Sequence, residues 1–119
     1  MELIDEIEEL IMMHQEGPYW DFKREWYDDS KDGDLLIDII CMANNLVDRD
    51  AYIIIGVNEE CDYAIQDVSQ DANRRNTQML TDFIRGKKFA GDFRPVVTVE
   101  QVHLDGGLVD VIVVHNIIN

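Results

Sequence analysis

The chain has 119 residues, of which 46% are hydrophobic, enough for one domain with a buried core and too many for a disordered chain. Its formal net charge of -15 repels phosphate on average, which excludes a surface that is basic throughout. There is no membrane-length apolar run and no signal-peptide pattern at the N-terminus, so a cytoplasmic location is expected.

The first part of the chain predicts a helix followed by a strand. Apolar residues recur at helical spacing over 2–15, and Gly17-Pro18 ends the helix because proline cannot continue its hydrogen bonds. Residues 19–26 alternate in polarity, which predicts a half-buried strand. Its apolar face would carry Trp20, Phe22 and Trp26, and its polar face Asp21, Lys23 and Glu25.

A polar loop over 27–33 separates this strand from a second predicted helix, residues 34–46, with Asp34 as its cap. The apolar residues of this helix are expected to be largely buried, Leu46 among them, and Cys41 is expected to be buried as well. Cys41 and Cys61 stand in no metal-ligand pattern, so both are expected to be reduced thiols.

The second half of the chain predicts mainly strands. Residues 51–57 form an uninterrupted apolar run typical of a central strand, and 63–68 a short partner strand. A helix is expected over 71–86, then a hairpin of 96–104 and 108–114 around an Asp-Gly-Gly turn. The predicted fold class is α/β (α+β): a single-domain sandwich of a mixed, mostly antiparallel sheet packed with about three helices.

The last predicted strand is strongly apolar, and Ile117-Ile118-Asn119 follows it without a further element. Since apolar sheet edges are usually covered, residues 1–119 are expected to be the N-terminal part of a longer protein with a further C-terminal domain. The alternative is that this edge pairs with a second copy as a homodimer.

Three acidic side chains and a lysine form a candidate metal site. Glu16 precedes the Gly-Pro turn, and Asp21 and Lys23 share a strand face. Asn58-Glu59-Glu60 follows the central strand and offers a third carboxylate, the alternative being a plain acidic turn. Two carboxylates ~4 Å apart repel by roughly 4 kcal/mol at an effective dielectric constant of 20, and Mg²⁺ or Mn²⁺ would relieve that repulsion. Lys23 could then stabilise charge on a phosphate. The alternative is a solvated face on which Lys23 pairs with Asp21 or Glu25.

Basic residues are concentrated in one region. Six of the ten lie within positions 73–95, on an otherwise acidic chain: Arg74, Arg75, Arg85, Lys87, Lys88 and Arg94. This basic cluster is a candidate nucleic-acid-binding surface, the alternative being the solvated polar face of a helix.

Other common sites are absent from the sequence. His14, His103 and His115 have no metal-ligand spacing, and no serine or cysteine stands in a nucleophile motif. Gly86-Lys87 is followed by Lys88 instead of serine or threonine, so there is no P-loop nucleotide site.

Several of these motifs together resemble the Schlafen-type AlbA domain. They are Glu16-x4-Asp21-Phe-Lys23, the Ala43-Asn44 of the second helix, and the strand Tyr52–Val57 continuing into Asn58-Glu59; Arg75-Asn76 and Arg94-Pro95 also fit. The resemblance covers roughly residues 14–115. The sequence departs from it at Asp21, where glutamate is usual, at Asp48–Asp50, where paired glycines are usual, and at Asn58-Glu59, where Asp-Asp is common.

The resemblance implies a domain that binds DNA or RNA, commonly in bacterial transcriptional regulators. In animal Schlafen proteins a similar domain cleaves tRNA and rRNA with three metal-binding carboxylates, which carry over to Glu16, Asp21 and Glu59. Three hypotheses follow: a nucleic-acid-binding module that uses the basic cluster, an Mg²⁺- or Mn²⁺-dependent endoribonuclease with Lys23 as electrostatic helper, and a protein-interaction or dimerisation domain.

Overall fold

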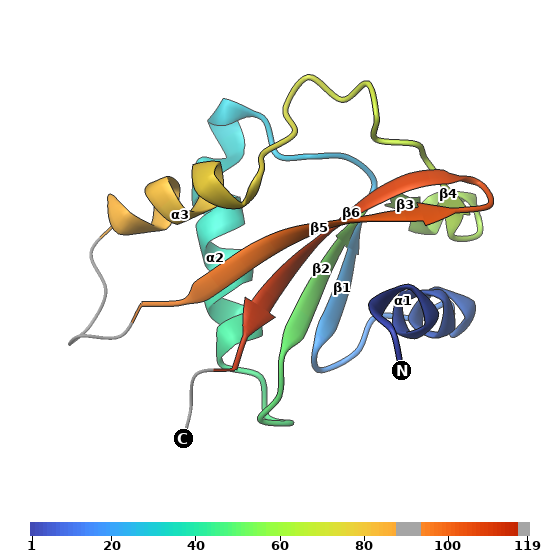
Figure 1. The fold of residues 1–119 in the computed structure, drawn as a ribbon, viewed down its shortest axis with the longest axis horizontal. Helices are drawn as coiled ribbons and strands as arrows, with labels where there is room; N and C mark the ends of the chain where they lie inside the picture. The colour runs from blue at the N-terminus through green and yellow to red at the C-terminus, as the bar shows by residue number, and fades with distance from the viewer. Residues whose placement is uncertain (88–93, 117–119) are drawn as a thin grey trace.

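The computed structural model describes residues 1–87 and 94–116 (Figure 1). Strands form a mixed four-stranded sheet in the order β1-β2-β6-β5, in which β1 and β2 are parallel and the other neighbours antiparallel. A second, two-stranded sheet pairs β3 with β4. The elements are α1 (Leu3–Met12), β1 (Trp20–Lys23), η1 (Asp29–Lys31), α2 (Asp32–Ala43), β2 (Ala51–Ile55), β3 (Val57–Asn58), η2 (Glu59–Cys61), β4 (Ala64–Ile65), α3 (Thr77–Arg85), β5 (Val96–Leu104) and β6 (Gly107–His115).

Helices cover both faces of the main sheet (Figure 1). On one face, Ile7 and Leu10 of α1 pack into a cluster that contains Phe22 of β1. On the other, α2 and α3 pack over the alternate residues of β2 and β6, with Leu35 and Leu80 fully buried. The predicted sandwich of a mixed, mostly antiparallel sheet with three α-helices is therefore confirmed.

The second helix is displaced towards the N-terminus from its predicted position. The Asp28 carboxylate accepts a hydrogen bond from the Ser30 backbone (2.9 Å) and begins a 3₁₀ turn that continues directly into α2, so the prediction of Asp34 as the cap is wrong. The side chain of Asn45 then donates to the Met42 carbonyl (3.0 Å) just after the helix ends at Ala43.

Two predictions of burial in this region are wrong. Leu46 lies in the turn beyond α2 and is 97% exposed. Cys41 is on the outer face of the helix and is exposed as well. The helix buries only the stripe that contains Leu35 and Ile39, because its opposite side faces away from the sheet.

The third helix is shorter than predicted and begins at Thr77 instead of 71. Asn76 is its cap, since the Asn76 side chain accepts from the backbone of Met79 (2.8 Å). The segment before it is held in turns by Asp71, whose carboxylate accepts from the backbone N–H groups of Asn73 (2.8 Å) and Trp26 (2.9 Å).

Trp26 was predicted on the same face as Trp20 and Phe22, and this is wrong. The strand ends at Lys23, and the following bend carries Trp26 to the opposite face of the sheet. There its indole N–H donates to the buried carboxylate of Asp110 (2.8 Å). Arg74 forms two further hydrogen bonds to the same carboxylate, at 2.9 and 3.0 Å.

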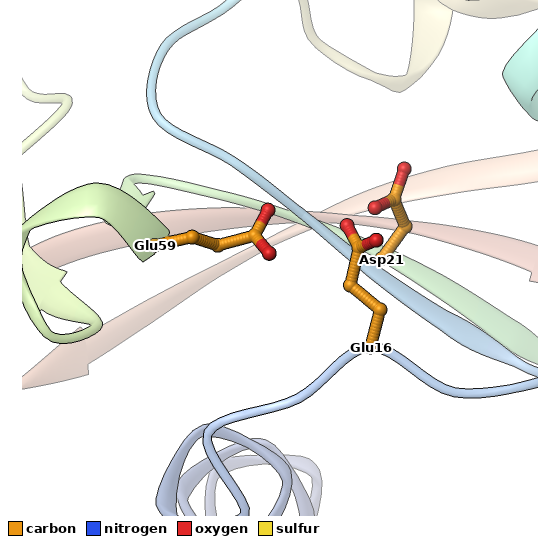
Figure 2. Close-up of side chains that lie close together, drawn as sticks. All are labelled: Glu16, Asp21 and Glu59. Atoms are coloured by element: carbon orange, nitrogen blue, oxygen red, sulfur yellow. The ribbon is translucent and has the colours of Figure 1, made fainter.

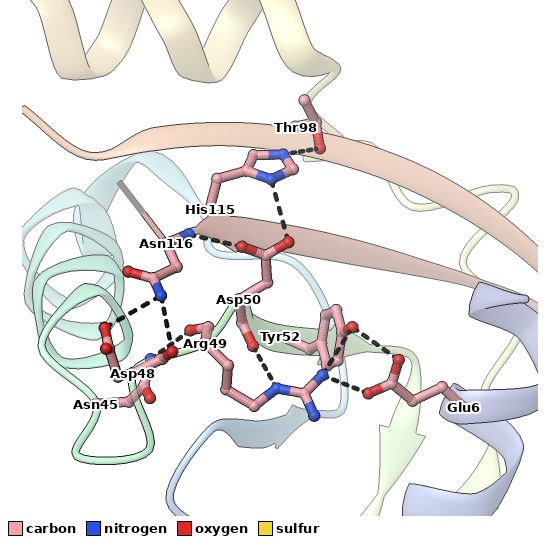
Figure 3. Close-up of polar contacts among 9 residues, drawn as sticks. All are labelled: Glu6, Asn45, Asp48, Arg49, Asp50, Tyr52, Thr98, His115 and Asn116. Carbon is pink, nitrogen blue, oxygen red and sulfur yellow. Dashed lines mark hydrogen bonds and ion pairs between the residues drawn. The ribbon is translucent and has the colours of Figure 1, made fainter. Parts of the chain in front are cut away.

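The turn before β2 contains Asp48–Asp50, where the Schlafen-type AlbA domains that the sequence resembles usually have paired glycines. These residues make specific contacts (Figure 3). Arg49 forms an ion pair with Glu6 of α1 (2.5 Å), and the hydroxyl of Tyr52 donates to the same carboxylate (2.9 Å). Burial and this hydrogen bond raise the pKa of Tyr52 to about 12. Asp50 accepts from the backbone of Asn116 (2.6 Å), which holds the end of β6. The turn therefore joins α1 to the sheet.

No helix in the described ranges, 1–87 and 94–116, is both long enough and apolar enough to cross a membrane.

Candidate metal centre

Three carboxylates from three different segments point toward one another (Figure 2). Glu16 lies in the loop after α1, Asp21 in β1 and Glu59 in η2, and one oxygen from each lies within 4.8 Å of the others. The three candidate metal ligands named from the sequence therefore lie together, and metal binding by them stays a prediction. Glu16 and Glu59 are exposed and Asp21 is half-buried, so the cluster is open to solvent on one side.

A tight turn folds Glu16 back onto the sheet. The Gly17 backbone N–H donates to the Trp20 carbonyl (3.2 Å), and the Trp20 indole donates to the Gln15 carbonyl (2.8 Å). A Cβ atom at Gly17 would lie 2.2 Å from the Trp20 ring, so only glycine fits under this indole. The turn brings Glu16 beside β1, as the Gly-Pro motif predicted.

One backbone N–H holds two of the three carboxylates together. Phe22 donates to Asp21 (2.9 Å) and to Glu16 (3.3 Å). The aromatic ring of Phe22 is buried on the other face of the strand, which fixes the direction of Asp21 because alternate residues of a strand point to opposite faces.

The predicted central strand is interrupted at Gly56, and the break directs Glu59 towards the cluster. Gly56 has φ +115°, and its backbone donates to the Lys23 carbonyl (2.7 Å). After it the chain leaves the main sheet as β3 and pairs with β4, the partner strand predicted over 63–68 and observed as Ala64–Ile65. Asn58 is nearly buried and accepts from the backbone of Glu60 (3.0 Å), so it caps the short helix that carries Glu59.

Lys23 lies between two carboxylates. Its ammonium is 3.5 Å from Asp21 and 3.4 Å from Asp38 of α2. Pairing with Asp21 was predicted as an alternative to a catalytic role, but the second partner is Asp38 and not Glu25. The Tyr27 hydroxyl donates to Asp38 (2.6 Å), and burial together with that carboxylate raises the pKa of Tyr27 well above its usual value. Asp38 and Tyr27 therefore hold Lys23 beside the cluster, and neither was singled out in the sequence.

The proximity of the carboxylates changes the pKa of Glu59. Burial, followed by the negative charge of Glu16, raises the pKa of Glu59 above its usual value, and the nearby Lys23 opposes this only in part. Glu59 therefore holds its proton more strongly in the folded state than in the unfolded chain. The stability gained from that proton is fully present below the ordinary glutamate pKa of ~4.3 and is lost as pH rises through the raised value.

The first prediction concerns this repulsion. In metal-free buffer, Glu59→Gln is expected to be more stable than the unmodified protein at pH 7, by up to ~1 kcal/mol, since exposed charges interact weakly. The difference should disappear near pH 4. Thermal unfolding in EDTA across this pH range measures it. Glu60→Gln, which changes an exposed neighbour outside the cluster, serves as the control and should show a smaller shift.

The donor set fits a hard divalent cation. Carboxylate oxygens suit Mg²⁺ and Mn²⁺, and opposite ligands of Mg²⁺ stand roughly 4.1 Å apart at 2.0–2.1 Å from the ion. At most one pair among three octahedral ligands is opposite, and adjacent ligands stand roughly 2.9 Å apart. The oxygens of Glu16, Asp21 and Glu59, within 4.8 Å of one another, would therefore close by up to ~2 Å, a movement that the exposed Glu16 and Glu59 side chains allow. The exposed side leaves room for water and for a phosphate oxygen.

An aromatic stack joins the same three segments. His14, two residues before Glu16, stacks on Tyr63, which follows Glu59 by four residues (ring centroids 4.7 Å apart). Tyr63 in turn meets the edge of Phe22 at 5.5 Å. His14 also lies 3.5 Å from the Asp62 carboxylate. No spacing rule indicated this stack, because its members are 8 and 41 residues apart in the sequence.

The basic cluster is divided by the fold. Arg74 is bound to Asp110, as described above, and the half-buried Arg75 pairs with Asp32 (2.6 Å) and lies over the ring of Phe83. The other described members gather at the end of α3. There Arg85 is 71% exposed, Lys87 lies over the Phe83 ring, and Arg94 donates to the Arg85 carbonyl (3.1 Å). Lys88 lies outside the described residues.

The fold and the cluster together define a class of protein: an α/β domain with three convergent carboxylates beside a pair of parallel strands. Comparison with protein-family models matches residues 16–118 to the family described as Schlafen, AlbA_2. The chain therefore belongs to the Schlafen AlbA_2 family, as its motifs suggested. No curated protein and no solved structure matches it.

Proposed function

We propose that this protein is a nucleic-acid-binding domain that holds a divalent cation at Glu16, Asp21 and Glu59 and cleaves structured RNA such as tRNA. The family fits nucleic-acid binding in general. The observation that carries the finer proposal is the convergence of the three carboxylates within 4.8 Å, with Lys23 beside them. A surface for binding alone would gain nothing from three like charges placed where they repel one another and a phosphate.

Each residue of the site has a role in this proposal. The bound cation would supply Lewis acidity and a water of lowered pKa. Asp21 and Glu16, held by the Phe22 N–H, and Glu59, held by the cap at Asn58, would orient that cation. Lys23, kept in place by Asp38, is positioned to donate to a phosphate oxygen as negative charge develops during cleavage.

A bound cation would also reduce the electrostatic repulsion between this acidic chain and a phosphate. A net charge of -15 opposes phosphate, and three of the six residues in the basic cluster, Arg74, Arg75 and Arg85, already pair with protein carboxylates. A divalent ion would reduce the charge of the three carboxylates from -3 to -1 and, with Lys23 beside them, would let a phosphodiester oxygen approach as a further ligand. The proposal thus predicts that RNA binding depends on the cation.

The second prediction tests cleavage. Labelled tRNA is incubated with the protein in Mn²⁺ or Mg²⁺, and cleavage is expected to stop in EDTA. Glu59→Gln and Asp21→Asn should each lower the rate by roughly 100-fold or more, since losing even an outer partner of a metal ligand costs about 10–100-fold in metal affinity or activity. Glu100→Gln, which changes an exposed carboxylate of β5 outside the cluster, is the matched control and should retain activity.

Cleavage that survives Asp21→Asn would exclude this site. Binding of RNA without cleavage in any of these metals would instead leave a nucleic-acid-binding module. Five further predictions from the sequence stay predictions: DNA as the ligand, a role in a regulator, homodimerisation, a protein-interaction role and a cytoplasmic location.

A further inference from the structure

Two hollows adjoin residues of the carboxylate cluster, and Arg24 lines both of them. The larger one, here called the β1–α2 hollow, has a volume of about 460 Å³ and is lined by residues that include Lys23, Arg24, Lys31, Asp34, Ile37 and Asp38. The smaller one, here called the η2 hollow, has a volume of about 230 Å³ and contains Glu59 of the cluster together with Asn58 and Glu60. The two hollows share Arg24 as a wall and are together called the trough here.

The β1–α2 hollow balances three cations against three carboxylates, Glu25, Asp34 and Asp38, on a chain with 25 acidic and 10 basic residues. Lys23, Arg24 and Lys31 are three of only ten basic residues, and all three line the β1–α2 hollow. Within residues 1–87 and 94–116, the ion-pair partner of Arg24 is its neighbour Glu25 (3.3 Å), and both side chains are more than half exposed. Exposed pairs of this kind contribute little, so Arg24 can exchange Glu25 for a phosphate at small cost.

The size and lining of the β1–α2 hollow suit one nucleotide. Its volume lies within the ~300–1,000 Å³ typical of small-molecule sites, whereas the η2 hollow is smaller than that range. Ile37 is 59% exposed and offers an apolar surface to a sugar or base. Asp34 and Asp38 offer acceptors for the N–H groups of a base edge.

We propose that unpaired RNA crosses the carboxylate cluster along this trough, with one nucleotide in the β1–α2 hollow and its flanking phosphates on Arg24 and Lys31. This inference rests on the proposed function and specifies its substrate as a single-stranded segment. A base inside a duplex is stacked and paired, so it cannot enter a hollow of one-nucleotide size. In a folded RNA the site of cleavage would then lie in a loop or an unpaired end.

The third prediction compares two double variants, each of which replaces two basic residues with glutamine. Arg24→Gln with Lys31→Gln removes two cations from the trough, and Arg85→Gln with Lys87→Gln removes two from the end of α3, so the change in net charge is equal. The ligand is a fluorescein-labelled single-stranded oligoribonucleotide, and fluorescence anisotropy is measured in Ca²⁺ to limit cleavage. Two lost phosphate contacts should weaken binding by roughly 25-fold near 0.1 M salt and reduce the slope of log K against log[salt] by about 1.4 for the trough pair.

A matched RNA duplex and Mn²⁺ binding complete the experiment. The duplex should bind more weakly than the single strand, and Mn²⁺ affinity, measured by electron paramagnetic resonance, should be retained in the trough pair. Weaker binding in the α3 pair than in the trough pair, or tighter binding of the duplex, would overturn the inference while leaving the metal site intact. Loss of Mn²⁺ binding in Glu59→Gln supports the proposed function, and its persistence would overturn that function separately.

Discussion

Asp110→Ala is expected to lower the free energy of unfolding by about 3 kcal/mol, a large share of the ~5–15 kcal/mol of a typical domain. Asp110 is 1% exposed at the centre of β6, and it accepts hydrogen bonds from the Trp26 indole and twice from the Arg74 guanidinium. Removing the carboxylate leaves the Arg74 charge and the Trp26 N–H without their partner. Arg74 keeps 27% of its side-chain exposure and can rehydrate in part, which places the loss at the lower end of the range for broken buried pairs.

Urea unfolding followed by tryptophan fluorescence measures this loss, since Trp26 contacts the changed residue directly. The control is the double variant Asp110→Leu with Arg74→Met, which removes both charges and should recover most of the stability. A loss below ~0.5 kcal/mol in Asp110→Ala, the size of an ordinary surface change, would show that the pair does not hold the Trp26 and Arg74 segments to the sheet.

Local patterns were sufficient for most elements of this fold. The hairpin of β5 and β6 was predicted within one residue, because two segments rich in β-branched residues on either side of an Asp-Gly-Gly turn have few other solutions. The central strand was predicted too, except that Gly56 breaks it. A glycine inside a strand pattern can indicate a bulge or bend, and here that bend is what carries Glu59 to the site.

The errors share a physical cause, which is contact between distant residues. Trp26 reads as a continuation of the β1 alternation, but its hydrogen bond to Asp110 spans 84 positions and requires the opposite face. Arg74 reads as part of a basic helix surface, but it also pairs with Asp110, 36 positions away. Neither partner can be recognised from the residues around it.

In the candidate site, too, local patterns indicated some residues, and contacts between distant residues could not be predicted. Glu16, Asp21 and Glu59 were named as candidate ligands from a turn, a strand end and a family motif, and the structure places them together. The groups that hold these side chains in place were not predicted. Among them, His14 and Tyr63 are the most informative, because they adopt costly backbone conformations at the ends of the two exposed ligand segments.

The stack of His14 on Tyr63 is formed by residues with φ +50° and +60°, left-handed conformations that bulky residues rarely adopt. Asp62 has φ +56°, so three of the four non-glycine residues with positive φ in the described ranges surround the carboxylates. Each such residue costs about 1–3 kcal/mol and persists only where surrounding contacts require it. Here the contact is the stack itself, which ties the Glu16 segment to the Glu59 segment.

Tyr63→Asn is therefore expected to weaken Mn²⁺ binding by about 10–100-fold, the usual effect of removing a group that orients a metal ligand. Asparagine accepts positive φ, so the backbone conformation is retained while the ring that contacts His14 and Phe22 is lost. Electron paramagnetic resonance of bound Mn²⁺ gives the affinity, and thermal unfolding in EDTA gives the stability of the same variant.

Tyr63→Phe is the matched variant, since it keeps the ring and removes only the hydroxyl, and it should bind Mn²⁺ like the unmodified protein. Unchanged affinity in Tyr63→Asn would show that Glu16 and Glu59 are held in place without the stack. Equal weakening in both variants would assign the effect to the hydroxyl instead. The expected order follows from geometry: three segments supply the carboxylates, and the rings of His14, Phe22 and Tyr63, one from each segment, are what keep those carboxylates together against their mutual repulsion.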